Sequence, residues 1–485
     1  MTEEYLQVIQ RVLAQGYQLS PDVFTLLQNK SVEEATQLVN DAIKRASSNS
    51  DLFILDLDLF EKPLIPSLKI IPYAATTKGF FEIHYPEEVK SIGSADGYID
   101  YFNSRLSQLE SIIKRRIDLR DVISLSQAVK LPLNTKFKTI GIVTSKRARN
   151  NRLFLDLEDK DTFTTVMVSG NEILKKGLEV LEDQVICVEG LRYREDLIIA
   201  NELIWPDVPM HELGRSNENV SVVFIGDVHI GSKYFRKDLF EKFLRWMNQE
   251  LGPNPSRNLA SQVKYLVIAG DLVDGIGIYP EQIDELTIYN QKEQYEEAAR
   301  LLENIPEHVE IIIIPGNHDA VRKSLPQPAV PEKYAERLYS NPRIHMAPNP
   351  IYLTLNGVKI FVAHGTALTD ILGSTPGHDF HNPITAVELL VKCRHIAPTY
   401  GSSTPIAPEN VDRLVITEIP DVVLMGHIHI HESKRYKGIS LISSGSFQDQ
   451  TPFQKRMKLE PTPGVISVFN LKTHNEIPLD LERLN

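Results

Sequence analysis

Apolar and polar positions near the start of the chain alternate with the period of an α-helix. Between residues 32 and 46 apolar side chains recur every three or four positions, and Ser31 with Glu34 forms the capping-box pattern that opens such a helix. We therefore predict a small helical N-terminal unit over residues 1–46. After it, a serine-rich stretch and several prolines interrupt the pattern, which predicts a linker and a loosely ordered segment over 47–95.

A second helical pattern, over residues 96–130, is predicted to be a connector. The pattern then changes to the strict alternation that is typical of half-buried β-strands. The strand candidates lie at 137–144, 152–157, 162–168, 185–190 and 197–205, with a helix candidate at 172–181. The order β-β-β-α-β-β is that of an OB-fold β-barrel, which we place at 131–212. Such barrels bind single strands or dock another subunit, and both roles stay open here.

From about residue 220 onward, short and wholly apolar runs alternate with helical segments. The buried strand candidates lie at 222–225, 265–268, 309–314, 351–355, 359–363, 422–424, 440–442 and 465–469. The helix candidates between them include 235–249 and 291–303. This alternation predicts an α/β domain over residues 213–485.

Composition narrows the class of protein. The chain has 485 residues, of which 42% are hydrophobic and 24% are charged, as in ordinary multidomain globular proteins. Lys and Arg number 52 and Asp and Glu number 64, so the net charge of −12 argues against a chain that coats nucleic acid by bulk charge. A local basic patch is compatible with that balance.

Targeting signals and disulfides are not expected. The sequence contains no apolar run of the ~18 residues that a membrane span needs, and its acidic start lacks the apolar part of a signal peptide. The two cysteines, Cys187 and Cys393, are far apart and belong to no C-x-x-C pair, which excludes a disulfide framework and a thiolate zinc site. We therefore expect a cytoplasmic protein without membrane contact.

Polar motifs follow the predicted strands of the α/β domain. In chain order they read G-D-V-H at 226–229, G-D-L-V-D at 270–274, P-G-N-H-D at 315–319, A-H-G at 363–365 and M-G-H-I-H at 425–429. Ligands of open α/β sheets bind beyond the carboxyl ends of the strands, so we expect the five motifs to converge. They supply carboxylate, amide and imidazole donors, which suit hard and borderline divalent metals. Any one motif is weak, but five in order at strand ends are specific.

This ordered set resembles the calcineurin-like metallophosphoesterase superfamily. The resemblance implies an α/β/β/α sandwich and a site for two divalent metal ions. It implies seven ligands, with one carboxylate shared by both metals: Asp227, His229, Asp271 and His429 for the first, and Asp271, Asn317, His364 and His427 for the second. Manganese (Mn2+) fits these donors best, with iron, zinc and magnesium left open.

The same resemblance places His318 beside the metals as a catalytic residue. A histidine there can protonate the leaving oxygen or stabilise the charge that grows on it. Asp319 follows directly and is expected to orient the His318 imidazole. Two neighbouring divalent cations supply the activation of water and the charge neutralisation that phosphoester hydrolysis needs.

Protein serine/threonine phosphatases of this superfamily usually carry an arginine after the second motif and end the third in glutamate. Here Asp274 is followed by Gly275 and the third motif ends in Asp319, which argues against a phosphoprotein phosphatase. The preceding barrel, together with several long tracts, instead resembles the small subunits of archaeal family D DNA polymerases, related to the B-subunits of eukaryotic replicative polymerases. The tracts lie at 275–280, 326–331, 394–401, 404–409 and 444–455.

That resemblance implies a proofreading 3′→5′ exonuclease, which hydrolyses the terminal phosphodiester of single-stranded or mismatched 3′ DNA ends. It implies the large catalytic polymerase subunit as a partner, with contact to the sliding clamp through the complex left open. Two alternatives remain: a non-catalytic scaffold subunit, and a phosphodiesterase acting on small substrates. The complete ligand set and His318 favour the enzyme, and the barrel argues against small substrates.

Basic side chains are candidates for DNA contacts in two places. They lie at the first predicted hairpin of the barrel and near the C-terminus: Lys136, Lys146, Arg147, Arg149, Lys455 and Arg456. Contact with the partner subunit is an equally open interpretation of both groups.

Overall fold

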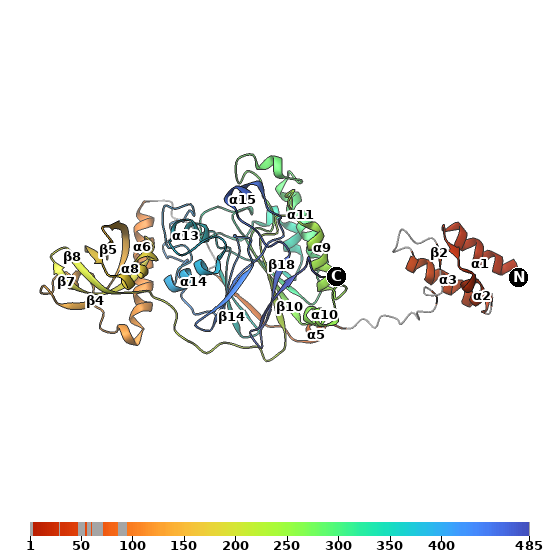
Figure 1. Cartoon of the computed structure of the whole chain (residues 1–485), viewed down its shortest axis with the longest axis horizontal. Coiled ribbons are helices and arrows are strands. Elements are labelled where there is room, and N and C mark those ends of the chain that lie inside the picture. The colour runs from red at the N-terminus through yellow and green to blue at the C-terminus, as the bar shows by residue number, and fades with distance from the viewer. Residues whose placement is uncertain are drawn as a thin grey trace. The chain divides into compact units, whose positions relative to one another are not determined.

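A computed structural model of the chain describes residues 3–28, 30–46, 54–55, 60, 71–85 and 95–484 (Figure 1). The chain divides into two units, residues 1–71 and 72–485. The described elements of the first unit are the helices α1 (Glu3–Ala14), α2 (Pro21–Gln28) and α3 (Val32–Ala46) and the parallel strand pair β1 (Gln18–Leu19) and β2 (Ile54–Leu55). The predicted capping box is confirmed, since the Ser31 N–H donates to Glu34 Oε2 (3.1 Å) and the Glu34 N–H donates to Ser31 Oγ (3.3 Å).

The segment that we predicted to be loosely ordered contributes a regular strand. After α5 (Tyr73–Thr76), β3 (Phe81–His84) pairs antiparallel with β13 (Ile351–Leu355) at the edge of a sheet. The Tyr265 hydroxyl fixes its start, accepting from the Phe80 N–H at 2.9 Å. A four-residue strand is too short for its alternation to stand out in the sequence. Much of the rest of 47–95 lies outside the described residues.

A closed five-stranded barrel follows the connector, and the predicted strands are confirmed. Its strands are paired in the order β4-β5-β6-β8-β7, and β4 closes the ring on β7. The elements are β4 (Lys136–Arg149), β5 (Arg152–Glu158), β6 (Phe163–Val168), α8 (Asn171–Leu178), β7 (Val185–Arg194) and β8 (Leu197–Ile204). Alternate residues of β5 fill the barrel core, where Leu153, Leu155 and Leu157 are fully buried.

The connector joins the barrel to the α/β domain through one buried ion pair. It contains α6 (Ala95–Lys114), the 3₁₀ turn η1 (Ile117–Leu119) and α7 (Leu125–Ala128). Arg105 of α6 is fully buried and donates to the Asp412 carboxylate (2.7 Å) and to the carbonyls of Asp183 (2.8 Å) and Pro398 (2.5 Å). These partners come from the α/β domain and from a barrel loop, so one guanidinium ties three parts of the fold together.

The α/β domain contains two six-stranded sheets. The first has the order β12-β11-β10-β9-β18-β19, and the second has the order β16-β17-β15-β14-β13-β3. The strands not yet given are β9 (Ser221–Ile225), β10 (Val263–Ala269), β11 (Glu310–Ile314), β12 (Ile344–Met346), β14 (Val358–Ala363), β15 (Val422–Met425), β16 (Glu432–Tyr436), β17 (Ile439–Ser443), β18 (Val465–Asn470) and β19 (Glu476–Asp480). Strands β9, β10 and β11 are parallel neighbours, and so are β14, β15 and β17.

The two sheets pack face to face between layers of helices. Along β9, Val222 and Phe224 enter the core between the sheets, whereas Val223 and Ile225 face the helices on the outer side. The helices are α9 (Lys237–Met247), α10 (Asn254–Ser261), α11 (Gln291–Leu302), α12 (Glu336–Ser340), α13 (Leu368–Ser374), α14 (Ile384–Cys393), α15 (Pro452–Met457) and the 3₁₀ turns η2 (Gln282–Glu285) and η3 (Glu332–Tyr334). Helices α9 and α11 cover the first sheet, and α13 and α14 cover the second.

Both cysteines are buried and free, as expected. Across the described ranges, no helix is at once long enough and apolar enough to cross a membrane.

His395, which shares the Asp412 carboxylate with Arg105, makes the fold sensitive to acid. His395 Nδ1 accepts from the Ala397 N–H (3.1 Å), so Nε2 carries the proton and donates to Asp412 (2.8 Å). Burial, together with nearby Arg105, lowers the pKa of His395 to about 4. A pKa below the unfolded value means that the folded state resists protonation. Stability is therefore complete above the unfolded pKa of about 6.5 and is lost as the pH falls toward 4.

We expect this loss to be measurable by urea unfolding at pH 7.5 and at pH 5.0. Between these pH values wild type should lose about 2 kcal/mol more than a His395→Asn variant, which has no imidazole to protonate. Equal losses in the two proteins would show that His395 is not the acid-sensitive group.

Candidate metal centre

The five polar motifs converge where the parallel strands of both sheets end. Their loops are bonded to one another across the two sheets. The Asp227 N–H donates to the Gly270 carbonyl (3.0 Å), the Gly426 N–H donates to the His364 carbonyl (2.8 Å), and the His427 N–H donates to Asp227 Oδ2 (2.9 Å). The backbone therefore helps to fix the motifs against each other.

All seven predicted ligands lie in one cluster. Six of them, together with His318, make up three groups whose donor atoms lie within 4.8 Å of one another: Asp227, His229 and His429; His229, Asp271 and His318; Asp271, His364 and His427. The Asp271 carboxylate lies 3.3 Å from His364 Nε2 and 3.7 Å from His229 Nε2, so it is shared by two groups. The seventh ligand, Asn317, directs Oδ1 to within 2.9 Å of His364 Nε2.

Two of the imidazoles are held in the tautomer that a metal ligand needs. The carbonyl of Ala269 lies 2.9 Å from His364 Nδ1, and because a carbonyl only accepts, Nδ1 carries the proton. The Asp274 carboxylate, 2.9 Å from His229 Nδ1, keeps the proton on that nitrogen in the same way. Each Nε2 lone pair is thus free to face the cluster. The third ring, His429, is anchored at Nδ1 by the Gln454 amide of α15, 3.0 Å away.

Five of the seven predicted ligands adopt the left-handed backbone conformation that favours glycine. Their φ angles are 53° for Asp227, 56° for His229, 50° for Asp271, 74° for His427 and 64° for His429. Side chains rarely occupy this region, at a cost of about 1 kcal/mol or more each. The conformation turns each donor back toward the cluster immediately after its strand.

A glycine makes room for the shared carboxylate. A Cβ atom at Gly316 would lie 2.1 Å from Asp271 Oδ1, closer than any two such atoms approach. The third motif therefore needs glycine before Asn317 because the chain passes directly over Asp271.

The electrostatics of the cluster call for a cation. Asp227, Asp271 and Asp274 are 0–1% exposed, and within the described residues their ion pairs are with histidines rather than with lysine or arginine. Burial raises the pKa of Asp227. Burial acts in the same direction on Asp271, but His364 and His318 outweigh it and hold the pKa of that carboxyl well below its usual range. Buried carboxylates, imidazoles and an amide oxygen form a donor set that fits a divalent metal.

The structure corrects the role that we predicted for Asp319. Its carboxylate accepts from the Tyr295 hydroxyl (2.8 Å) and from the Gly316 N–H (2.8 Å), and thus stabilises the loop of the third motif. The ring of His318 is oriented by another residue, since Nδ1 lies 2.8 Å from the Asp274 carbonyl. Adjacency in sequence suggested the pair, but the two consecutive side chains have different partners.

The cluster opens into a cavity of about 710 Å3. His229, Asp271, Asn317, His318, His427 and His429 line it, together with loop residues around Tyr279 and the helix α15. Of the basic residues predicted to contact DNA, Arg456 lines this cavity, and Lys455 is exposed beside it on α15.

The basic residues of the barrel lie elsewhere and differ among themselves. Lys146 donates to the carbonyls of Leu178 (3.1 Å) and Val180 (2.6 Å), and burial lowers its pKa. Its ammonium group therefore stabilises the barrel. Arg147 is paired with Asp156 at 2.6 Å. Lys136 and Arg149 are exposed, as a DNA contact requires.

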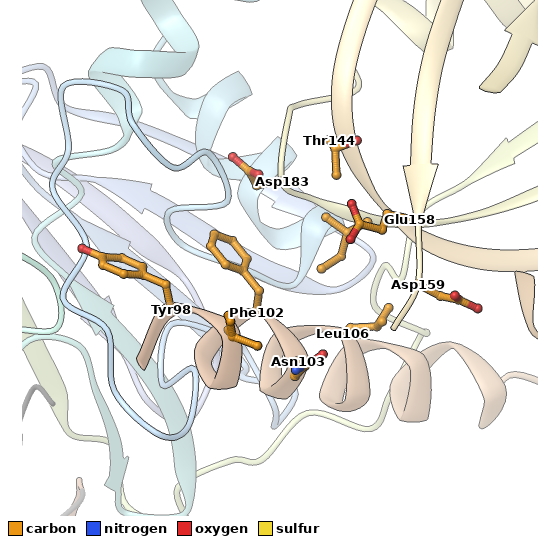
Figure 2. A pocket seen from close by; sticks show the side chains of 10 residues that line it. Tyr98, Phe102, Asn103, Leu106, Thr144, Glu158, Asp159 and Asp183 are labelled. Atoms are coloured by element: carbon orange, nitrogen blue, oxygen red, sulfur yellow. The ribbon is translucent and has the colours of Figure 1, made fainter. Parts of the chain in front are cut away.

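A second cavity, of about 310 Å3, lies where α6 faces the barrel (Figure 2). Tyr98, Phe102 and Leu106 of α6 form one side, with Thr144 and Glu158 of the barrel opposite. Among the described residues that line this cavity there is no histidine or cysteine, so it lacks the imidazole donors of the first.

Sequence reasoning missed the residue that connects the metal cluster to His318. Asp274 is fully buried, accepts from His229 through its carboxylate, and accepts from His318 through its carbonyl. Gln282 and Gln448 donate to the same carboxylate, each at 3.1 Å. The available signal was its position as the last residue of the G-D-x-x-D motif, whose spacing alone assigns it no side-chain role.

Comparison with known proteins identifies the class of protein to which the α/β domain belongs. A family model for the B-subunit of DNA polymerases alpha and epsilon matches residues 222–434, which include all five motifs. The layered domain and its cluster thus fall in the class of DNA polymerase B-subunits.

The relatives define the family more narrowly. Proteins named "DNA polymerase II small subunit" are 35% identical in Pyrococcus horikoshii, 36% identical in Archaeoglobus fulgidus and 41% identical in Methanothermobacter thermautotrophicus. The matches cover 86%, 95% and 78% of this chain and 70%, 95% and 78% of those relatives, respectively. The chain belongs to the family of archaeal DNA polymerase II small subunits, which confirms the membership predicted from the motifs.

Proposed function

We propose that this chain is the proofreading 3′→5′ exonuclease subunit of a heteromeric DNA polymerase, and that it works bound to a large catalytic subunit. It hydrolyses the terminal phosphodiester of single-stranded or mismatched 3′ ends. One observation carries the proposal: all seven donors and His318 are present in one largely buried cluster, most of which lines a cavity. A scaffold role has no need of His318.

The fold supports the same assignment. We propose that the barrel is an OB fold, because its strand order β4-β5-β6-β8-β7, with α8 after the third strand, matches that topology. We propose that residues 213–485 are a calcineurin-like phosphoesterase sandwich, because two sheets lie face to face between helical layers with the motifs at their strand ends.

The donor set fits two divalent cations that share Asp271, and manganese suits its carboxylate, amide and imidazole donors best. When bound, such cations supply activation of water and neutralisation of the phosphoryl oxygens. Asp227, His229 and His429 would hold one ion, and Asn317, His364 and His427 the other, with Asp271 between them.

The residues of the chain supply the proton chemistry. His318 lines the cavity, and its Nδ1 is fixed by the Asp274 carbonyl, so Nε2 is the atom directed to the substrate. A protonated Nε2 can donate to the leaving 3′ oxygen as the phosphodiester bond breaks. Asp274 sets the position of both His318 and His229, and thereby couples the proton donor to the ligand set.

The expected effect of His318→Ala is a decrease in kcat of about 10²–10⁴-fold, with manganese binding retained, because the proton donor is lost and no ligand is removed. The measurement is single-turnover degradation of a 3′-mismatched primer in Mn2+, alone and with the large subunit, with manganese binding followed by calorimetry. A matched control is His381→Ala, an exposed histidine outside the cluster. Equal degradation by wild type and His318→Ala would show that His318 is not the proton donor, and no degradation by wild type would support the scaffold role instead.

A further inference from the structure

We propose that the α15 wall of the cavity is a binding site for the unpaired base at the end of the DNA strand, and that Phe453 is the side chain on which the base stacks. This inference rests on the proposed function, since it names the part of the substrate that the same site recognises.

The position of α15 is fixed by the metal cluster itself. The Gln454 side-chain amide lies 3.0 Å from His429 Nδ1, and the Thr451 hydroxyl caps the helix by accepting from the Gln454 N–H at 3.2 Å. Phe453 immediately precedes Gln454, so their Cα atoms are about 3.8 Å apart. The backbone at Phe453 is therefore next to a residue that contacts a predicted metal ligand.

The face of α15 toward the cavity carries one aromatic, one cationic and one thioether side chain. Phe453, Arg456 and Met457 all line the cavity and follow the i, i+3, i+4 spacing of a single helix face. Phe453 is 57% exposed and Met457 is 49% exposed, although both are apolar. Neither is used in the protein core, so the face is available for a flat ligand. Aromatic rings stack on any nucleobase regardless of its identity.

Other residues that line the cavity are aromatic as well. The ring of Tyr279 lies 6.2 Å from that of His318, and its hydroxyl donates to Glu285 (2.9 Å), which fixes the side chain. Phe380 also lines the cavity. These aromatic side chains and the cluster residues line one cavity, so a base bound there lies in the same cavity as the cluster that would receive its phosphate.

This arrangement distinguishes unpaired from paired ends. A paired terminal base already has its Watson–Crick edge bonded and one face stacked on its neighbour, and it must lose both to reach Phe453. An unpaired base has no Watson–Crick hydrogen bonds to break before it reaches Phe453. Arg456 is the one Lys or Arg side chain among the described residues that line the cavity, so contacts with the phosphates of a duplex do not explain the selectivity.

The experiment compares two single-stranded oligonucleotides that differ only at the 3′-terminal nucleotide, which is either natural or abasic. Wild-type protein with its large subunit, in Mn2+, is expected to show a KM about tenfold higher for the abasic end, because stacking is lost, with kcat little changed. Phe453→Ala should raise the KM for the natural end by a similar factor and leave the abasic end unaffected. Phe453→Trp should restore the preference, and Phe163→Ala, an exposed aromatic on the barrel, is the matched control.

A binding measurement separates this inference from the proposed function. In the His318→Ala background, an oligonucleotide with 2-aminopurine at its 3′ end should lose fluorescence on binding, and Phe453→Ala should abolish the quenching. Equal KM values for natural and abasic ends in wild type, or quenching that survives Phe453→Ala, would overturn the stacking site. If wild type degrades neither substrate but the quenching depends on Phe453, the exonuclease proposal fails and the base site stands.

Discussion

Replacing Asp271 by asparagine is expected to lower manganese-dependent hydrolysis of 3′ ends by more than about 10³-fold. Asp271 belongs to two of the three donor groups, so its loss should disrupt the proposed sites for both ions together. Asparagine has the same shape, and its oxygen can still accept from the His318 N–H, which Asp271 Oδ1 now does at 2.8 Å. The fold should therefore survive while the shared negative charge is lost.

Two measurements check this expectation. Hydrolysis of a mismatched primer reports the reaction, and the melting temperature with and without Mn2+ reports binding, because an ion that binds only the folded state raises it. Asp379→Asn removes an exposed carboxylate, 68% accessible, and should match wild type in both assays. A manganese-dependent rise in melting temperature that persists unchanged in Asp271→Asn would contradict the assignment of Asp271 as the shared ligand.

Replacing Arg105 by methionine is expected to lower the free energy of unfolding by about 3–5 kcal/mol. The methionine side chain fills similar space but leaves the Asp412 carboxylate buried with the neutral His395 imidazole as a hydrogen-bond donor, and it removes the donors of two carbonyls. Burial favours the neutral form of Asp412, but His395 and Arg105 together outweigh it and hold the pKa of this carboxyl well below its usual range. The His395 Nε2–H donates to the same carboxylate, and this hydrogen bond remains when the guanidinium is gone.

Urea unfolding followed by tryptophan fluorescence suits this test, because Trp205 packs against both the barrel core and the core of the second sheet. The control is Arg147→Met, which removes an ion pair whose arginine side chain is 62% exposed and should cost less than about 1 kcal/mol. A double variant, Arg105→Met with Asp412→Asn, should recover part of the loss because no charge then remains unpaired. An Arg105→Met protein as stable as the Arg147→Met control would show that the buried ion pair does not stabilise the contact of α6 with the barrel and the α/β domain.

The sequence allowed those parts of the fold to be predicted that depend on local patterns. Each barrel strand carries its own alternation, and the buried strands β9, β10 and β11 are short apolar runs, so both sets were placed within a few residues. Strand β16 (Glu432–Tyr436) shows why others were missed: it is a polar edge strand, largely exposed, whose place is set by pairing with β17. Edge strands of this kind have no apolar face to reveal them.

The same distinction applies to the candidate site. The ligands could be named because their types and spacing recur as motifs, and the structure brings them together in one cluster. No role was predicted for Asp274, and the contacts of Asp319 and Lys146 differ from the predicted ones, because each depends on which atoms a folded loop brings within reach. A lone arginine in a helix, such as Arg105, gives no sign in sequence that it will be buried.

The left-handed conformation of five ligands has a consequence for how this family can change. Glycine is favoured at such positions, and a ligand replaced by glycine would release about 1 kcal/mol of backbone strain along with a buried polar group. Selection for stability alone would therefore erode the centre, one donor at a time. Retention of all five predicted ligands against that gradient is the outcome that selection for the proposed reaction would produce.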